Sequence, residues 1–342
     1  MSLLSKFKAF LGFASPNASI KPPTTSDTTT HPAQTHFRPH DESSDTVTLP
    51  DGRKLGYAQY GSLTGKAILY MHGLPGSRLE GAHFHDIGLE LGARIISVDR
   101  PGMGLSSPQP KRTLLGFAKD VGHLTDHLGL ESYAVLGASG GGPSVLACAA
   151  GLPGRLKCVS IVCGLGPPDI GMSGAGWMHR LAFPWGYRLA PYWMGRLFWK
   201  MDATGRLDLS DEERLALLLR PGSMLQKSAN GKDSDIMANK HFLRLSLRSS
   251  REAFAQGYDA VWDDGRLMCR DFGFRVQDIR PDLPVQLWYG KYDYAVPVNH
   301  GLQVAARLGG SDRVQLRVED ESHAGIFFHW KREIIENLLS KM

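Results

Sequence analysis

The fold is decided by the stretch YAVLGASGGGPSV, residues 133–145. Its first four residues form a short apolar run typical of a buried strand, and the small residues from Gly142 onward favour a helix. Between them lies Gly137-Ala138-Ser139-Gly140-Gly141, a G-x-S-x-G motif in a strand–turn–helix context. The turn is too tight for a Cβ on either side of the serine, which accounts for the glycines. The motif therefore predicts a serine held in a strained turn, with its hydroxyl above the end of a strand.

A serine in this position is predicted to be a nucleophile. The N–H of Gly140 would lie at a helix N-terminus, where partial positive charge stabilises an oxyanion. A second amide is expected from Leu74 in the loop HGLPG, residues 72–76, which directly follows the apolar run AILYM. We interpret His72 as a residue that shapes this loop. The alternative to the whole interpretation is a glycine-rich turn with an incidental serine.

A serine hydroxyl needs a base to take its proton and an acid to orient that base. Asp293 follows the apolar run VQLWY, and His323 follows the apolar run VQLRV. Both residues therefore lie just beyond the carboxyl ends of predicted strands, in the chain order Ser, Asp, His. Asp169, which follows the run LKCVSIV, is the rival for the acid.

Short apolar runs alternate with helical patterns along the chain, which predicts a mostly parallel sheet with helices on both faces. The turn Pro50-Asp51-Gly52 predicts a hairpin in front of these runs. A helix is predicted over Leu114–Leu130, and the turn DRPGMG at 99–104 is interpreted as the floor of the site. The predicted strands are Thr46–Leu49, Lys54–Tyr57, Ala67–Met71, Ala93–Val98, Tyr133–Leu136, Leu156–Val162, Val285–Tyr289 and Val314–Val318.

Residues 165–282 break this alternation. They hold five of the seven tryptophans, helical patterns such as Asp211–Leu219, and no convincing pair of strands. We expect a helical cap over the carboxyl ends of the strands, inserted between the two parts of the core at 46–164 and 283–342. The aromatic residues suit a hydrophobic substrate, and packing within the cap explains them equally well.

Residues 1–45 are predicted to be a disordered N-terminal tail. The part from Ser15 to His40 is rich in Ser, Thr, Pro and His, and it cannot bury enough apolar surface to offset its ordering entropy. Apolar residues at helical spacing within residues 3–13 leave several interpretations open. They are a weak membrane-surface or partner anchor, a mitochondrial presequence without arginine, and a frayed tail. The long apolar region of a secretory signal is absent.

The sequence Ser340-Lys341-Met342 is similar to the Ser-Lys-Leu tripeptide that the peroxisomal import receptor binds. The alternative is an amphipathic helix that ends this way by chance. We expect an intracellular protein, either cytoplasmic or peroxisomal, with a mitochondrial location as the third alternative.

Composition excludes several classes of protein. The 39 basic and 34 acidic residues are interleaved, giving a net charge of +5 without a basic run, so we expect no nucleic-acid partner. The four cysteines form no pair with metal-ligand spacing, which predicts buried free thiols and no metal site. No apolar run reaches the roughly 18–20 residues that cross a bilayer. The predicted chemistry needs no cofactor.

From about Thr46 to Met342, outside the cap, the chain resembles the α/β-hydrolase fold superfamily. The resemblance implies a triad of Ser139, Asp293 and His323, with the oxyanion held by the amides of Leu74 and Gly140. The motifs that carry it are HGLPGSR (72–78), DRPGMGLS (99–106), GASGGGP (137–143), GKYDYAVP (290–297) and SHAG (322–325).

These motifs are similar to those of the esterase, lipase and proline-iminopeptidase-like branch of the superfamily. The resemblance implies a serine hydrolase that cleaves a carboxylic ester of a hydrophobic small molecule. Serine in place of aspartate at position 139 argues against epoxide hydrolases and haloalkane dehalogenases. Gly140-Gly141 departs from the bulky residue that iminopeptidases carry beside the nucleophile. Acyl transfer, carbon–carbon bond hydrolysis, an iminopeptidase and a non-catalytic ligand receptor stay open as alternatives.

Overall fold

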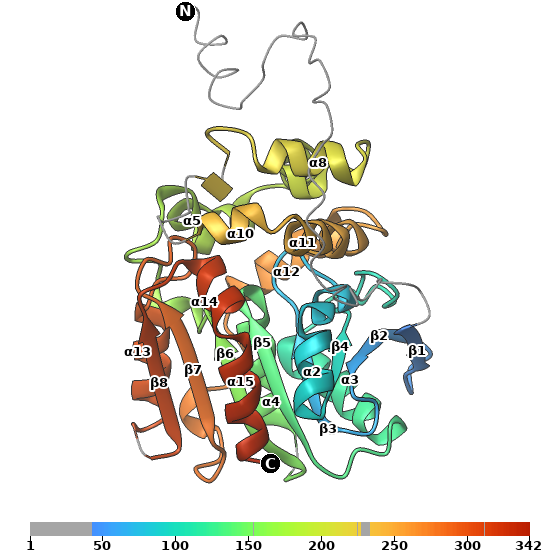
Figure 1. The fold of residues 1–342 in the computed structure, drawn as a ribbon, viewed down its shortest axis with the longest axis vertical. Coiled ribbons are helices and arrows are strands. Elements are labelled where there is room, and N and C mark those ends of the chain that lie inside the picture. The colour runs from blue at the N-terminus through green and yellow to red at the C-terminus, as the bar shows by residue number, and fades with distance from the viewer. Residues whose placement is uncertain (1–42, 153, 224, 227–232, 311) are drawn as a thin grey trace, which may run out of the picture. The chain divides into compact units, whose positions relative to one another are not determined.

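The computed structural model of the protein describes residues 43–342 except 153, 224, 227–232 and 311. Its centre is an eight-stranded sheet in the order β1-β2-β4-β3-β5-β6-β7-β8 (Figure 1). The β1–β2 and β2–β4 pairs are antiparallel and the other neighbours are parallel, so the predicted sheet is confirmed. The strands are β1 (Ser44–Thr48), β2 (Lys54–Gly61), β3 (Lys66–Met71), β4 (Ala93–Val98), β5 (Tyr133–Ala138), β6 (Leu156–Val162), β7 (Val285–Gly290) and β8 (Val314–Glu319).

The sheet begins slightly earlier than the sequence suggested. Ser44 and Asp45 belong to β1, where Ser44 pairs with Ala58 of β2, so these two residues do not belong to the tail expected over 1–45. The Ser44 hydroxyl also accepts a hydrogen bond from Arg78 Nε at 2.8 Å. Residues 1–42, which include the apolar segment at 3–13, lie outside the described residues.

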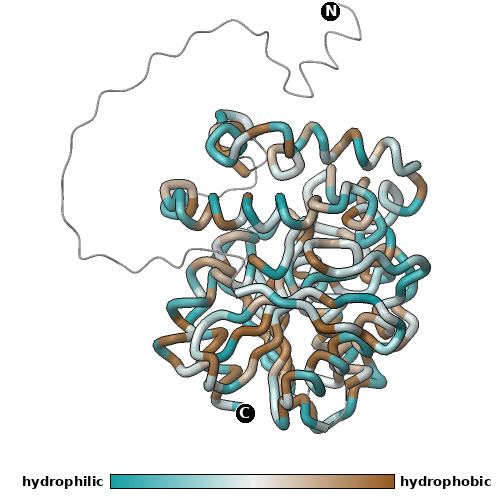
Figure 2. Tube along the Cα trace, turned by 90° about the vertical axis from the view of Figure 1, so that its right-hand side faces the viewer, coloured by the Kyte–Doolittle hydropathy of each residue, from teal (hydrophilic) through white to brown (hydrophobic). Residues whose placement is uncertain are grey.

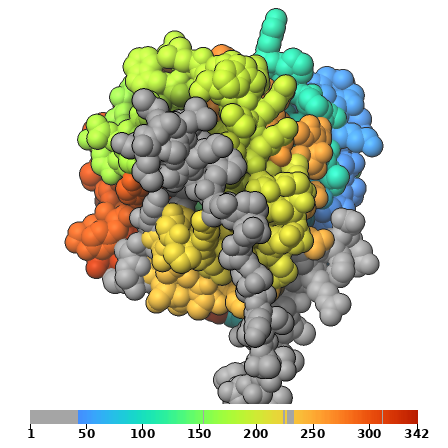
Figure 3. All heavy atoms as spheres, turned by 90° about the horizontal axis from the view of Figure 1, so that it is seen from above, coloured from blue at the N-terminus to red at the C-terminus, as the bar shows by residue number. Residues whose placement is uncertain are grey.

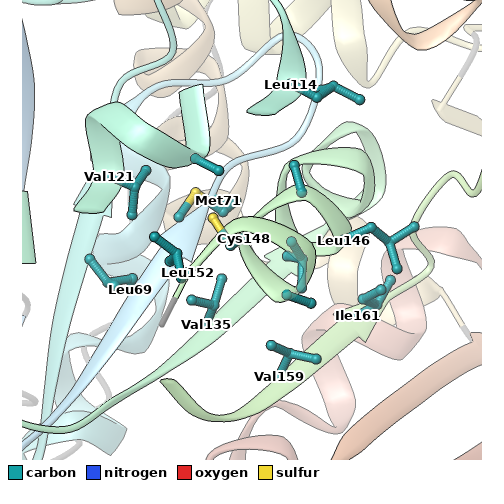
Figure 4. Close-up of a cluster of buried hydrophobic side chains, with 14 of the residues drawn as sticks. Leu69, Met71, Leu114, Val121, Val135, Leu146, Cys148, Leu152, Val159 and Ile161 are labelled. Carbon is teal, nitrogen blue, oxygen red and sulfur yellow. The ribbon is translucent and has the colours of Figure 1, made fainter. Parts of the chain in front are cut away.

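Both faces of the sheet are covered, which is why its central strands read as continuous apolar runs. On one face, Leu69 and Val135 pack with side chains of α3 (Leu114–His127) and α4 (Gly142–Gly151) (Figure 4). On the other face, Ile68 packs with residues of η2 (Arg78–Phe84) and α15 (Lys331–Ser340). Figure 2 shows hydrophobic residues concentrated along the central strands. The remaining core helices are α2 (His85–Leu91), η3 (Ser139–Gly141), α13 (Asn299–Arg307) and α14 (His323–His329).

The helix predicted over Leu114–Leu130 ends at His127. Gly129 adopts a φ of +63°, in the left-handed region that favours glycine, and Leu130 N–H then bonds back to the Thr125 carbonyl. The glycine therefore ends the helix three residues before the apolar pattern does.

Between β6 and β7, the described residues form helices and no strand. Hydrogen bonds join this inserted segment to the loops that follow β3, β4 and β8. They connect Ser77 N–H to Ser249 Oγ, Gly104 N–H to the Glu252 carbonyl, and Ser322 Oγ to Asp233. The segment therefore lies at the carboxyl ends of the strands, above the sheet in Figure 1. Its helices are η4 (Pro168–Ile170), α5 (Trp177–Leu181), η5 (Ala182–Gly186), α6 (Tyr187–Leu189), α7 (Tyr192–Met201), η6 (Ala203–Gly205), α8 (Asp211–Leu218), α10 (Ser234–Ala238), α11 (Lys240–Ala253), α12 (Asp259–Met268) and η7 (Val276–Asp278).

Within the described ranges, no helix is both long enough and apolar enough to cross a membrane. Helix α15 ends at Ser340, and Met342 packs, partly buried, against the same core as α15. Recognition of residues 340–342 by an import receptor stays a prediction.

Candidate active site

Ser139 lies in the turn between β5 and α4 and adopts a φ of +52°, in the left-handed region that is strained for a residue with a side chain. A Cβ on Gly137 would lie 2.5 Å from Val145 Cγ2, and one on Gly141 would lie 2.1 Å from the carbonyl oxygen of Met71. Neither position has room for a side chain. The two glycines therefore let the chain pass close to β3 and α4 while Ser139 is held in the strained turn.

Leu74 lies against Gly140, so the two predicted oxyanion amides are neighbours. A Cβ on Gly140 would lie 2.8 Å from Leu74 Cβ and 3.2 Å from the Leu74 backbone nitrogen. The N–H of Gly140 belongs to the first turn of a helical stretch, where it has no intrahelical acceptor. Among the described residues, none accepts a hydrogen bond from the Leu74 N–H. Both amides are therefore available to a ligand.

Polar side chains hold the loop that carries Leu74. The Gly73 N–H donates to Glu80 Oε1 at 2.9 Å, and the Gly73 carbonyl accepts from Arg100 Nη2 at 2.8 Å. Arg100 Nε in turn lies 2.7 Å from Asp264 Oδ2 in α12, and both side chains are buried. Because Glu80 already occupies the Gly73 N–H, the Leu74 N–H is the free donor at this point of the loop.

His72 is fully buried at the start of the same loop. Its Nε2 accepts from the Arg100 N–H at 3.3 Å, so its Nδ1 carries the proton and donates to the Gly73 carbonyl at 3.0 Å. Burial, together with the nearby Arg100 charge, lowers the pKa of His72 well below its ordinary value. A neutral histidine fixed at both nitrogens agrees with the loop-shaping role predicted for it.

The predicted acid and base lie together at the carboxyl ends of β7 and β8. Asp293 Oδ2 lies 2.7 Å from His323 Nδ1. Asp293 Oδ1 accepts from the N–H groups of Ala295 and Val296, both at 2.8 Å, and the Asp293 side chain has no exposed surface. The carboxylate is therefore fixed by two amides on one oxygen and orients the imidazole with the other.

Burial lowers the pKa of His323, but the charge and hydrogen bond of Asp293, with the charge of Glu80, outweigh it and leave this pKa raised. The bond to Asp293 uses Nδ1, which leaves Nε2 for a second partner. In the described part of the chain, no hydrogen bond joins His323 to Ser139 Oγ. Such bonds are often long in unliganded enzymes and shorten when a substrate binds.

The rival acid, Asp169, lies elsewhere. It is mostly exposed on the surface and forms two bonds with Arg307, at 2.7 and 3.0 Å, which lower the pKa of its carboxyl. Asp293 is therefore the acid that the fold brings to His323.

In the described part of the chain, ligand-type atoms of Cys163, Asp293 and His323 lie within 4.8 Å of one another. Asp293 and His323 already bond to each other. Burial raises the pKa of the Cys163 thiol well above its ordinary value. This trio is therefore suited to orienting an imidazole rather than to holding a metal ion. All four cysteines are buried and free, as predicted.

Two cavities flank this region. A small apolar cavity is lined by Leu165, Phe183, Met268 and other residues. Met268 also borders Gly140, since a Cβ there would lie 3.1 Å from Met268 Cε. A larger cavity of about 490 Å³ lies between the loop 101–112 and α12, and its lining contains no predicted catalytic residue. The small cavity is therefore the one adjacent to the predicted oxyanion amides.

A model of the alpha/beta hydrolase fold matches residues 66–332. The chain belongs to the α/β-hydrolase fold family. Its mostly parallel sheet with helices on both faces is the fold that the sequence motifs predicted.

Relatives and solved structures agree with this membership. An uncharacterized hydrolase of Bacillus subtilis is 34% identical over 119 residues, 34% of this chain and 40% of that protein. A 2-hydroxy-6-oxo-6-phenylhexa-2,4-dienoate hydrolase of Comamonas testosteroni is 24% identical over 78% of this chain and 84% of its own length. An α/β-hydrolase fold protein from Nakamurella multipartita superposes with a TM-score of 0.61 at 22% identity, covering 87% of this chain and 99% of that chain.

Sequence reasoning missed two residues that shape the site of this α/β hydrolase. Glu80 lies seven positions after Gly73, and its carboxylate also accepts from the Tyr70 hydroxyl at 2.6 Å. The position of an acidic residue this close to the loop 72–76 was the feature of the sequence that could have indicated Glu80. Asp264, the partner of Arg100, gave no signal, because 164 positions separate the two residues in the sequence.

Replacing Gly141 by alanine should destabilise the fold strongly, because the new Cβ would meet the backbone oxygen of Met71 and a strand would have to move. We expect a loss of about 3 kcal/mol in the free energy of unfolding, measured by chemical denaturation. The matched control is Gly154→Ala, at an exposed glycine where an added Cβ would have no atom within 4 Å. There the change should stay within about 0.5 kcal/mol. Equal stability of the two variants would contradict the tight contact.

Proposed function

We propose that the protein is a serine hydrolase that cleaves a carboxylic ester of a hydrophobic small molecule. The observation that carries the proposal is the 2.7 Å contact between the buried Asp293 carboxylate and His323, on the same edge of the sheet as the strained Ser139. An acid that orients a base beside a strained serine is the arrangement that activates a hydroxyl for attack on a carbonyl.

The proposed reaction proceeds through an acyl-enzyme. His323 Nε2 takes the proton of Ser139 as its oxygen attacks the ester carbonyl, and the N–H groups of Leu74 and Gly140 bind the oxyanion. His323 then gives this proton to the departing alcohol. A water molecule, deprotonated by His323, attacks the acyl-enzyme and releases the acid, with the proton returning to Ser139. The net change is ester plus water to acid plus alcohol.

The inserted segment is proposed to serve as a cap that selects the substrate. It supplies Phe183 and Met268 to the apolar cavity beside Gly140. This cavity has a volume of about 10 Å³, so it marks an apolar wall of the site and does not by itself hold an acyl chain. Helix α12 of the inserted segment also supplies Asp264 to Arg100, so the cap and the oxyanion loop are tied together. A movement of α12 would therefore displace the loop that carries Leu74.

Carbon–carbon bond hydrolysis is the second candidate. The Comamonas relative, whose match covers 84% of its own length, carries the name of a hydrolase of 2-hydroxy-6-oxo-6-phenylhexa-2,4-dienoate. The same serine, histidine and aspartate would serve that reaction. Incubation with this dienoate and with aryl esters in parallel separates the two functions by which substrate is consumed.

Ser139→Ala should reduce the hydrolysis of an aryl ester by about six orders of magnitude, to the background rate, because the attacking oxygen is lost. The assay is kcat/KM on p-nitrophenyl esters of increasing chain length. Ser160→Ala is the matched control, since Ser160 is equally small, is buried in β6 and has a hydroxyl with no hydrogen-bond partner among the described residues. A wild-type enzyme that cleaved no ester, or a Ser139→Ala enzyme as active as the control, would contradict the proposal.

Asp293→Asn should change both the height of the pH profile of kcat/KM and the position of its acid limb. Catalysis needs neutral His323, so the rate falls as the pH drops through its pKa, which Asp293 raises. Removing that negative charge lowers the pKa and moves the acid limb of the profile to lower pH. The rate at neutral pH should fall by about three to four orders of magnitude.

The control for this profile is Asp169→Asn, which removes an exposed acid that pairs with Arg307. It should leave both the height of the profile and its acid limb unchanged. An acid limb that moves equally in both variants would show that Asp293 has no special action on His323.

A further inference from the structure

An exposed apolar surface lies on the inserted segment, on the helices α5, η5, α6 and α7. Fifteen large hydrophobic side chains are exposed in the described part of the chain, and nine of them fall between Trp177 and Phe198. We call these nine the apolar patch. Three are tryptophans, Trp177, Trp185 and Trp193, with 55%, 57% and 64% of their surface exposed. Large apolar side chains exposed at this density along one segment are typical of interaction sites in soluble proteins.

The patch is not exposed because its helix lacks contact with the rest of the protein. Helix α7 already has a packed side, where Trp199 is buried and Gly195 lies so close to the Trp262 ring that a Cβ would be 2.3 Å from it. Its opposite side carries Trp193 and Leu197, both more than half exposed. A helix with apolar side chains on two opposite sides buries both only if something packs on each side. In the described part of the chain, only one side of α7 is covered.

The chain segment that carries the patch is basic, and two acids of α12, Asp259 and Asp263, contact it through Arg196 and Tyr192. Residues 170–201 contain no aspartate or glutamate, and they contain the basic residues Arg180, Arg188, Arg196 and Lys200. Arg196 pairs with Asp259 of α12, which neutralises it. The other three leave the segment basic, although acidic residues are nearly as numerous as basic ones in the whole chain.

Tryptophans beside basic residues are the combination that binds the headgroup region of a membrane. The indole ring is apolar with one polar N–H, so it favours the boundary between water and hydrocarbon. Lysine and arginine near that boundary are attracted to anionic headgroups. A second copy of the chain is the alternative occupant of the patch, and the experiment below separates the two.

We propose that the apolar patch docks the protein onto an anionic lipid surface. Its side chains would enter the headgroup region while Arg180, Arg188 and Lys200 contact the anionic groups. In Figure 3, which looks down on the inserted segment, the yellow-green residues of this region occupy a broad part of the surface.

The docked face borders the candidate site. His179 of α5 lies edge-on to the Tyr294 ring at 6.2 Å, next to Asp293, and the charge of His323 is among the causes that lower the pKa of His179, after burial. Phe183, in the turn after α5, lines the apolar cavity next to Met268. On the basis of the proposed function, the ester is therefore a lipid-soluble one that reaches the site from the membrane side.

The test is co-sedimentation of the full-length protein with vesicles of phosphatidylcholine alone, or of equal parts phosphatidylcholine and phosphatidylserine. We expect binding to the anionic vesicles that weakens at high salt. Trp193→Ser/Leu197→Ser should bind at least about tenfold more weakly. The matched control is Leu89→Ser/Leu302→Ser, which removes two leucines that are about as exposed but lie on α2 and α13.

Arg180→Glu/Arg188→Glu should also lose binding to the anionic vesicles. All three double variants should hydrolyse a short soluble ester at the wild-type rate, which shows that they are folded. The apolar patch is not the docking surface if the wild type does not bind, or if the patch variant and the Leu89/Leu302 control lose binding equally. A wild-type dimer that Trp193→Ser/Leu197→Ser converts to a monomer, without vesicle binding, would assign the patch to a second copy instead.

The experiments can contradict the docking proposal without contradicting the proposed function, and the reverse also holds. Ser139→Ala should bind vesicles as tightly as the wild type while cleaving no ester. Vesicle binding by a wild type that cleaves no ester would remove the proposed function and keep the docking. Ester cleavage by a wild type that does not bind vesicles would remove the docking and keep the proposed function.

Discussion

The structure depends on one steric constraint, the close approach of the turn after β5 to the end of β3. The Cα of Gly141 lies so near the Met71 carbonyl that a Cβ has no space, and Gly137 is equally confined against Val145. This contact holds Ser139 at a positive φ above the sheet. It also brings the first turn of the helical stretch beside the loop after β3, so Gly140 and Leu74 become neighbours. A strained residue persists only where its surroundings fix it this firmly.

A chain of polar contacts, centred on the buried Arg100 and Asp264, extends that constraint into the inserted segment. Glu80 and Arg100 hold the N–H and the carbonyl of Gly73, and Arg100 continues to Asp264 of α12. Removing one partner of such a buried pair leaves a charge without compensation, which is costly. The position of the Leu74 amide is therefore coupled to the packing of α12. The segment that bears the apolar patch packs on the same helix, through Trp262.

The sequence predicted the sheet well, because strands covered on both faces read as apolar runs and the turns carry their own glycines. It also indicated where Ser139, Asp293 and His323 would lie, since the carboxyl ends of parallel strands share one edge of the sheet. It could not identify Glu80 or Asp264 as site residues, because nothing local marks contacts between distant side chains. Tryptophan content alone could not show that Trp199 and Trp262 are buried while Trp177, Trp185 and Trp193 are exposed. That difference depends on which side of each helix the rest of the chain covers.

The central claim is that the fold activates Ser139, and active-site labelling tests it most directly. The measurement is the intact mass of the folded protein after incubation with a fluorophosphonate, followed by peptide mapping of the modified residue. We expect a single adduct on Ser139 that forms on the folded protein and is absent after denaturation. A folded protein that stays unlabelled, or one labelled at another residue, would contradict it.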